Sequence, residues 1–228
     1  MRIGVLGGIG PEATAEFYSK LIKRLQEKGL IKKNNDFPQI VVNSIPAAEL
    51  IYENISDNEL EMYIVGLKEL DQFGVDFIVM VCNTIHLYHN RLQKEINTEI
   101  IDLRQELKKL LIRKGIRSVL VVGTPNTVKQ GLYRFECIDT FEPDKKEILE
   151  LTDSIFNFNR GINKQLQIKR VKKICQGYLA KEAETVVLGC TEFAVMLGEE
   201  DFPKINTIDV LVEAVITKYL EVKNGNKI

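Results

Sequence analysis

Apolar residues recur along the chain in short runs, which are separated by longer segments with the apolar spacing of amphipathic helices. The short runs are rich in Val and Ile and do not alternate strictly with polar residues. This pattern is typical of strands that are buried on both faces of a parallel sheet. Strands are predicted at Arg2–Leu6, Gln39–Asn43, Phe77–Val81, Glu99–Ile101, Ser118–Val122, Thr185–Leu188 and Lys204–Asn206.

The longer segments predict helices, and two of them have recognisable ends. Pro11 stands in the first-turn position of the first helix, and "SDNE" (residues 56–59) is a good capping sequence before the second, which ends ahead of Gly74. Strands that alternate with helices predict parallel sheets with right-handed crossovers. Helices are predicted at Glu12–Glu27, Asp57–Gln72, Thr84–Ile96, Leu103–Lys114, Asn163–Leu179 and Ile208–Val222.

The two halves of the chain resemble each other. "IGVLGGIGP" and "VLVVGTPNT" each place a loop of small residues after a strand, and each half later contains a strand that ends on a cysteine. A weak internal duplication accounts for this similarity. We therefore expect an α/β protein with two similar domains, each a mainly parallel sheet flanked by helices. The expected domains are residues 1–102 plus 208–228 and residues 103–207, with the active site in the cleft between them.

Composition and charge narrow the possible ligands. Of the 228 residues, 45% are hydrophobic and 28% charged, which is ordinary for a globular protein. The 31 basic and 32 acidic residues give a formal net charge of -1, so there is no electrostatic basis for binding nucleic acid or an anionic membrane. No apolar run approaches the roughly 20 residues that span a bilayer. We expect a small-molecule ligand and neither nucleic acid nor membrane as partner.

Two of the four cysteines stand in matching contexts. Cys82 lies in "DFIVMVCNTIH" and Cys190 in "ETVVLGCTEF", so each follows a β-branched run and precedes polar residues. Cys137 and Cys175 lack this context, and we interpret both as structural. The chain has no C-x-x-C pair, which favours the reduced cytosol and hence a cytoplasmic location.

The position of Cys82 and Cys190 suggests chemistry. Ligands bind beyond the carboxyl ends of strands in open parallel sheets, and both cysteines are predicted there. Each is followed by a helix, whose N-terminus is expected to lower the pKa of the thiol. A buried structural cysteine would explain either position alone, but the pair favours a function. The following residues offer side-chain donors and acceptors: Asn83, Thr84, Thr191 and Glu192.

The glycine-rich loop at residues 7–13, "GGIGPEA", contains a G-x-G-x-x-A pattern after the first strand. This is a weak dinucleotide signal, and the second strand ends without the acidic residue that would hold a ribose. We interpret the loop as a tight turn that brings the backbone close to a small ligand. A plain turn between strand and helix is the alternative.

Two further features have a functional and a plainer explanation. His86 and His89 form C-x-x-x-H-x-x-H with Cys82, and Cys190 would complete a zinc site. Ordinary helix histidines explain the spacing as well, and no metal is expected. Arg160, in "FNRGIN", lies in a polar break between helices. An Arg there can hold a carboxylate of the substrate, or it is a surface residue beside Gly161.

Three segments together, "GVLGGIGPEAT", "VCNTIH" and "VVLGCTE", closely resemble the aspartate/glutamate racemase superfamily. The branch of aspartate racemases and broad-specificity amino-acid racemases is the most similar, and the resemblance runs over nearly the whole chain. It implies two similar α/β domains around a shared active site, usually in a homodimer. It also implies racemisation without pyridoxal phosphate or any other cofactor, in which Cys82 and Cys190 act on opposite faces of the amino acid.

The resemblance also assigns roles to other residues. Ile9 and Thr124 fall where the family lines its pocket, and Arg160 falls near a basic residue that meets the side-chain carboxylate. Aspartate-selective relatives carry an Arg after the second strand, but "NSIPAAELIYENIS" has no basic residue. Ala48 takes its place, and Asn54 is expected to offer a polar contact. The residues that match the family's positions for binding the α-amino and α-carboxylate groups of the substrate are Asn83, Thr84, Thr191 and Glu192.

The expected function is therefore racemisation of an amino acid, with aspartate, converted from L to D and back, as the favoured substrate. One alternative is a broad-specificity or non-aspartate amino-acid racemase. Another is an isomerase of the maleate isomerase type, which uses one cysteine as a nucleophile. A non-catalytic amino-acid-binding protein and a zinc protein complete the alternatives.

Overall fold

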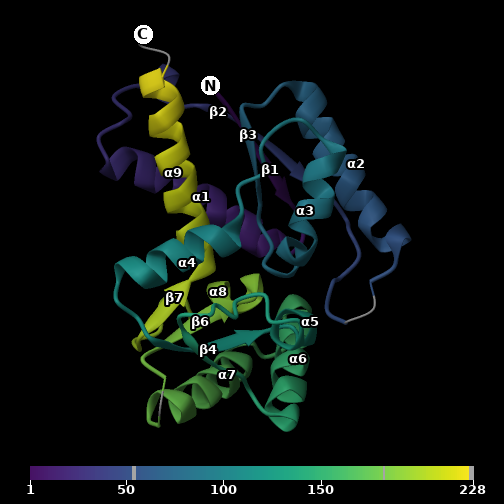
Figure 1. The fold of residues 1–228 in the computed structure, drawn as a ribbon, viewed down its shortest axis with the longest axis vertical. Coiled ribbons are helices and arrows are strands. Elements are labelled where there is room, and N and C mark those ends of the chain that lie inside the picture. The colour runs from purple at the N-terminus through teal and green to yellow at the C-terminus, as the bar shows by residue number, and fades with distance from the viewer. Residues whose placement is uncertain (53–54, 182, 226–228) are drawn as a thin grey trace.

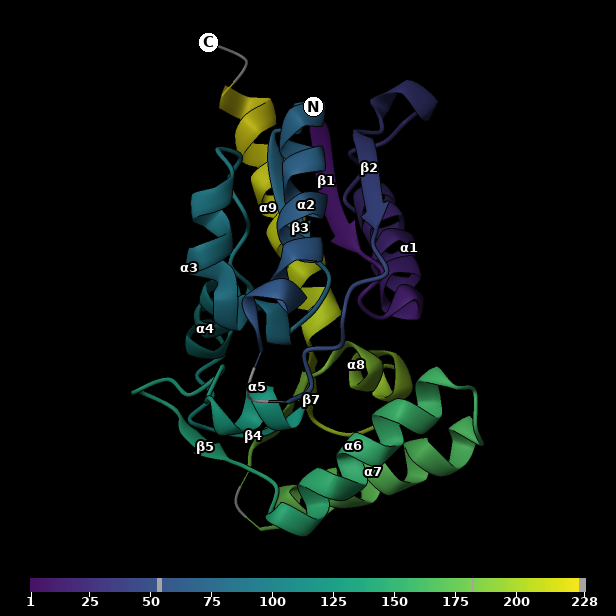
Figure 2. The same ribbon diagram turned by 90° about the vertical axis from the view of Figure 1, so that its right-hand side faces the viewer.

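The computed structural model describes residues 1–52, 55–181 and 183–225. It contains two separate parallel sheets, one in each half of the chain. The first sheet has the strand order β2-β1-β3, with β1 at Arg2–Gly7, β2 at Gln39–Ser44 and β3 at Phe77–Met80. The carboxyl ends of β1 and β2 point toward the second half of the molecule (Figure 2).

The second sheet has the order β5-β4-β6-β7, and all of its pairs are parallel. The sheet is built from β4 (Ser118–Gly123), β5 (Asp139–Phe141), β6 (Thr185–Gly189) and β7 (Lys204–Asn206). The α/β architecture with two parallel sheets is thus confirmed.

Helices cover both faces of the first sheet (Figure 1). Helix α1 (Pro11–Glu27) and the last helix, α9 (Thr207–Gly225), lie on one face, whereas α2 (Asp57–Phe73) lies on the other. The alternation of β3 explains the arrangement, because Phe77 and Val79 belong to the core beside α1, and Ile78 and Met80 to the core beneath α2.

The second half contains shorter helices around its sheet. These are α4 (Leu103–Arg113), α5 (Pro125–Lys129), α6 (Lys145–Asn159), α7 (Lys164–Leu179) and α8 (Thr191–Leu197). Helices α6 and α7 lie side by side (Figure 2), and α7 packs against β4 and β6. Helix α9 packs against both α1 and α4, so the core is continuous between the halves. The division at residues 102 and 207 stays a prediction.

The strand predictions need two corrections. Residues Glu99–Ile101 form no strand and contribute a single bridge between Ile78 and Ile100. Strand β5 was not predicted, because its three residues, Asp139–Phe141, carry no apolar run.

The predicted helix Thr84–Ile96 is also wrong as a continuous element. The structure has a 3₁₀ helix at Thr84–Tyr88, one α turn, α3, at His89–Leu92 and another 3₁₀ turn at Gln93–Glu95. In a 3₁₀ helix, side chains three residues apart are eclipsed. His86 and His89 accordingly stack, with ring centroids 6.0 Å apart and planes at 14°.

None of the helices in the described ranges combines the length and apolarity needed to cross a membrane.

Candidate active site

A cavity of about 260 Å³ lies where the two halves meet, beyond the carboxyl ends of the strands. This volume is just below the ~300 Å³ at which typical small-molecule pockets begin, so it suits a compact metabolite. The loops after β1, β2, β3, β4 and β6 line it together with α6. The predicted site residues among its lining are Ile9, Cys82, Asn83, Thr84, Thr124, Cys190, Thr191 and Glu192.

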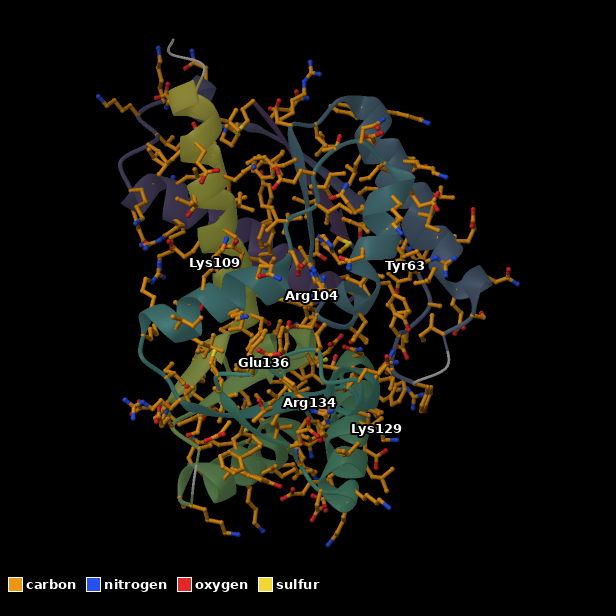
Figure 3. The ribbon with its side chains drawn as sticks, viewed as in Figure 1. Tyr63, Arg104, Lys109, Lys129, Arg134 and Glu136 are labelled. Carbon is orange, nitrogen blue, oxygen red and sulfur yellow. The ribbon has the colours of Figure 1, made fainter. Side chains whose placement is uncertain are left out.

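A larger groove of about 630 Å³ runs between α4 and α9, and neither cysteine lines it. Its lining carries charges of both signs, including Lys109, which Figure 3 shows on α4. The smaller cavity is therefore the one that holds the predicted chemistry.

The two cysteines enter the cavity from different halves of the molecule. Cys82 follows β3 with one residue between, and Cys190 directly follows β6 as the N-cap of α8. Both are almost fully buried, with 7% and 4% of their surfaces exposed. Both cysteines line this one cavity. A molecule in the cavity is thus flanked by both.

Burial dominates the ionisation of both thiols. It raises the pKa of Cys82 to about 12, although the backbone N–H groups of Ile85 and Thr84 favour the thiolate. Burial also raises the pKa of Cys190 well above its usual range, and the charge of Glu192 adds to this. The expectation of lowered pKa values is therefore wrong, since desolvation outweighs the N–H groups.

Glu192 is the carboxylate nearest to a thiol. The Cys190 Sγ donates a hydrogen bond to Glu192 Oε2 at 2.8 Å, and the Thr191 hydroxyl donates to the same oxygen at 3.1 Å. Asn159 Nδ2 donates to Glu192 Oε1 at 3.3 Å. No side-chain ammonium or guanidinium pairs with this carboxylate in the described part of the chain. Glu192 can thus accept the proton of Cys190 or bind a ligand ammonium.

The loop after β1 makes a tight turn against Glu192. Gly8 and Gly10 have φ angles of 85° and 83°, which favour glycine. A Cβ at Gly8 would lie 2.4 Å from the Ile45 carbonyl oxygen, and one at Gly10 would lie 3.0 Å from Glu192 Oε1. Glycine therefore lets this backbone, with Ile9, reach the cavity.

The side chain of Asn83 is hydrogen-bonded to the protein through both its oxygen and its nitrogen. Its Oδ1 accepts a hydrogen bond from the Tyr133 hydroxyl, and its Nδ2 donates to Thr207 Oγ1 at 3.1 Å. Thr207 in turn donates to the Leu188 carbonyl oxygen at 2.8 Å, two residues before Cys190. This chain of buried groups connects the two cysteine loops. Sequence reasoning missed Tyr133 and Thr207, because neither stands in a motif.

Three threonine hydroxyls form a second link between the halves. Thr84 Oγ1 lies 3.1 Å from Thr124 Oγ1 and 3.0 Å from Thr127 Oγ1. The Thr124 hydroxyl also caps α5 by accepting from the Thr127 backbone N–H at 3.1 Å. Thr84 and Thr124 both line the cavity, so their hydroxyls can turn toward a carboxylate there.

The remaining predicted residues lie elsewhere. Arg160 ends α6, is exposed and stands 6.0 Å from the centroid of the Phe156 ring, outside the described lining of the cavity. Its neighbour Asn159 lines the cavity instead. Ala48 is absent from the described lining too, whereas Glu49 next to it lines the cavity. Asn54 lies outside the described residues.

The histidines do not converge on the cysteines. His86 is fully buried with Nδ1 3.9 Å from Asp102, and His89 Nε2 lies 3.0 Å from the Ile100 carbonyl oxygen. Burial lowers the pKa of His86 to about 3. Within the described ranges no cluster of three or more His, Cys, Asp or Glu side chains is placed to hold a metal ion. The zinc alternative thus has no structural support.

Comparisons with known proteins agree with this geometry. The broad-specificity amino-acid racemase RacX of Bacillus subtilis is 22% identical over 227 residues, which cover 96% of this chain and 98% of RacX. The aspartate racemase of Picrophilus torridus superposes with a TM-score of 0.76 at 25% identity, covering 95% of this chain and 93% of that one.

An aspartate racemase homologue from Pyrococcus horikoshii OT3 has a TM-score of 0.71 at 24% identity, with 95% of this chain and 97% of the other covered. The family model described as Asp/Glu/Hydantoin racemase matches residues 6–215. The chain therefore belongs to the Asp/Glu/Hydantoin racemase family and is an amino-acid racemase.

Proposed function

We propose that the protein racemises a free amino acid without a cofactor, and that Cys82 and Cys190 are the two acid–base groups. One observation carries the proposal: both thiols line the same small cavity, and they reach it from opposite halves of the molecule. A racemase needs an acid and a base on opposite faces of the α-carbon, and cysteines that follow strands of two different sheets can supply such a pair.

The reaction moves one proton at each face. One cysteine, as thiolate, removes the α-proton and becomes a thiol, while the other thiol protonates the planar carbanion from the opposite side and becomes the thiolate. The roles reverse for the other enantiomer. Burial raises the pKa of both thiols and so favours their neutral forms. The α-ammonium of a bound amino acid adds a nearby positive charge, which favours the thiolate.

The surrounding polar groups suit the rest of the substrate. The hydroxyls of Thr84 and Thr124 can donate to the α-carboxylate, where negative charge grows as the α-proton leaves. Glu192 offers an acceptor for the α-ammonium. The Asn83 side chain already satisfies Tyr133 and Thr207, so we assign it to positioning the loop.

The test is exchange of the α-proton in deuterated water, without added pyridoxal phosphate or metal. In wild-type protein, deuterium should enter the product enantiomer first, because the second thiol carries solvent deuterium while the recovered substrate keeps its proton. Cys82→Ala and Cys190→Ala should each lower racemisation by about 10³-fold. Proton NMR and chiral chromatography measure both quantities.

Other outcomes would support the alternatives. An isomerase that uses one cysteine would tolerate loss of the other and form a covalent adduct, which mass spectrometry detects. A binding protein would bind amino acids with no exchange. Either outcome would overturn the two-cysteine proposal.

Aspartate is the first substrate to test, since the resemblance favours it, and the name of RacX adds the alternative of a broader range. We also propose a homodimer, which light scattering after size-exclusion chromatography tests. A cytoplasmic location stays a prediction.

A further inference from the structure

We propose that the preferred amino acid carries a cationic side chain, an amine or guanidinium, and that Glu49 binds it. This inference rests on the proposed racemisation and names its substrate class. It follows from the charges around the cavity, the hydrogen bonds that hold the loop carrying Glu49 and the apolar surface beside it.

The charged side chains that line the cavity are all acidic. They are Glu12, Glu49 and Glu192, and the described lining contains no Lys, Arg or His. Glu12 is neutralised by Lys164, whose Nζ lies 2.6 and 2.9 Å from its two carboxylate oxygens. Glu192 faces Cys190 and is assigned to the α-ammonium. Glu49 is left for the side chain of the substrate.

Glu49 is an exposed residue of the cavity lining, and the charge of Glu192 acts on it. Burial raises its pKa, the charge of Glu192 raises it further, and Arg160 opposes both. No hydrogen bond or ion pair holds its carboxylate within the part of the chain that the structure describes. A cationic ligand group in the cavity beside Glu49 would offset the repulsion between Glu49 and Glu192. An anionic side chain would add to that repulsion.

The loop that carries Glu49 is fixed on both sides of this residue. The Ala48 carbonyl accepts a hydrogen bond from the hydroxyl of Tyr63, which Figure 3 shows on α2. The Leu50 carbonyl accepts from Asn126 Nδ2 at 3.3 Å, and the Ile51 carbonyl accepts from the Asn126 backbone N–H at 3.1 Å. Both halves of the molecule therefore hold the backbone on either side of Glu49 beside the cavity.

The position along the chain strengthens the argument. The loop after β2 carries Glu49 and has no basic residue from Ile45 to Tyr52. Ala47, Leu50 and Ile51 of the same loop line the cavity, as Ile155 does. Such apolar side chains suit the methylene groups of lysine or ornithine, whose charged ends can then reach an acidic group.

The experiment compares L-lysine, L-norleucine and L-aspartate as substrates of wild-type, Glu49→Gln and Glu49→Arg proteins. Norleucine has the chain length of lysine without its charge. We expect kcat/KM for lysine to exceed that for norleucine about tenfold and that for aspartate about 100-fold. Glu49→Gln should lower the lysine-to-norleucine ratio of kcat/KM about tenfold. Glu49→Arg should lower the lysine-to-aspartate ratio of kcat/KM about 100-fold.

Glu12→Gln is the matched control, because its carboxylate also lines the cavity but is already paired with Lys164. It should change the lysine-to-norleucine ratio less than about threefold. Racemisation of aspartate or norleucine as fast as lysine, or a ratio that Glu49→Gln leaves unchanged, would overturn the inference while the racemase stands.

Calorimetric binding of the three amino acids separates this inference from the proposed function. Lysine binding that Glu49→Gln weakens, without α-proton exchange, would remove the racemase proposal and support the cationic subsite. If none of the three is bound or exchanged, the cationic subsite is wrong, and so is aspartate as the substrate of the proposed racemisation.

Discussion

Glu192 is the single residue that most directly controls the thiols. Its charge raises the pKa of Cys190 and of Cys82, and its Oε2 accepts the Cys190 proton in a hydrogen bond. A neutral amide in its place would remove the repulsion of the thiolates but also the proton acceptor. This replacement should therefore make the thiols more acidic and at the same time lower the rate of catalysis.

We expect Glu192→Gln to lower the pKa of Cys190, so that its alkylation by iodoacetamide begins at lower pH than in wild type. Racemisation should nevertheless fall about 100-fold, because the carboxylate no longer accepts the thiol proton or the α-ammonium. Mass spectrometry of alkylated peptides across pH, with chiral chromatography, measures both effects. An alkylation curve at unchanged or higher pH would show that Glu192 does not control this thiol.

At the scale of elements, buried hydrogen bonds join loops that follow strands of different sheets. Tyr133 and Thr207 hold Asn83 between the loop after β3 and the end of β6. Asn126 at the start of α5 holds the loop after β2. The site thus depends on contacts between elements that are far apart in sequence.

Tyr133→Phe removes one of these links with almost no change in shape. It leaves the buried Asn83 Oδ1 without its donor, which should cost about 1–3 kcal/mol of unfolding free energy. We expect kcat to fall more than KM changes, because the loops of the two cysteines lose their alignment while the binding groups remain. Urea unfolding and steady-state kinetics test this.

Tyr178→Phe is the matched control for this change. The Tyr178 hydroxyl donates to the Glu142 carbonyl oxygen at 3.1 Å and to Glu147 at 2.8 Å, away from the cavity. It should lower stability without lowering kcat. Equal effects of the two variants on kcat would assign Tyr133 to stability alone.

For the whole molecule, buried thiols couple stability to pH. Burial raises the pKa of Cys82 and of Cys175 from 9.0 to about 12. The folded protein therefore holds these protons more tightly than the unfolded chain, and the stability they contribute is complete below pH 9 and is lost as pH rises toward 12. Each thiol should lower the unfolding free energy by up to about 1.4 kcal/mol per pH unit in this range.

Cys175→Ala should reduce the slope of unfolding free energy against pH by the contribution of one thiol. The substituted residue lies on α7, away from the cavity. Urea unfolding of both proteins between pH 8 and 10.5 compares the slopes. Parallel curves would mean that Cys175 is already accessible to solvent in the folded state.

The central strands could be predicted because local composition decides them. Phe77–Met80 and Thr185–Gly189 are almost entirely β-branched or apolar, so their burial follows from their residues. Strand β5 has no such run and exists because Ser118 to Leu120 of β4 pair with it. The broken helix after Cys82 likewise follows from its surroundings, because His86 and His89 are buried there.

The sequence by itself determined the two parallel sheets, the pair of cysteines at strand ends and the family, since all of these depend on residue types at short spacing. Only the tertiary structure decided that the cavity lining excludes Arg160 and includes Glu49. It also decided that Asn83 is hydrogen-bonded to Tyr133 and Thr207, and that burial raises the pKa values of the two thiols. The physical reason is that desolvation and charge pairing depend on which distant segments meet, and residues as far apart as Asn83 and Thr207 become neighbours only when the two halves pack together.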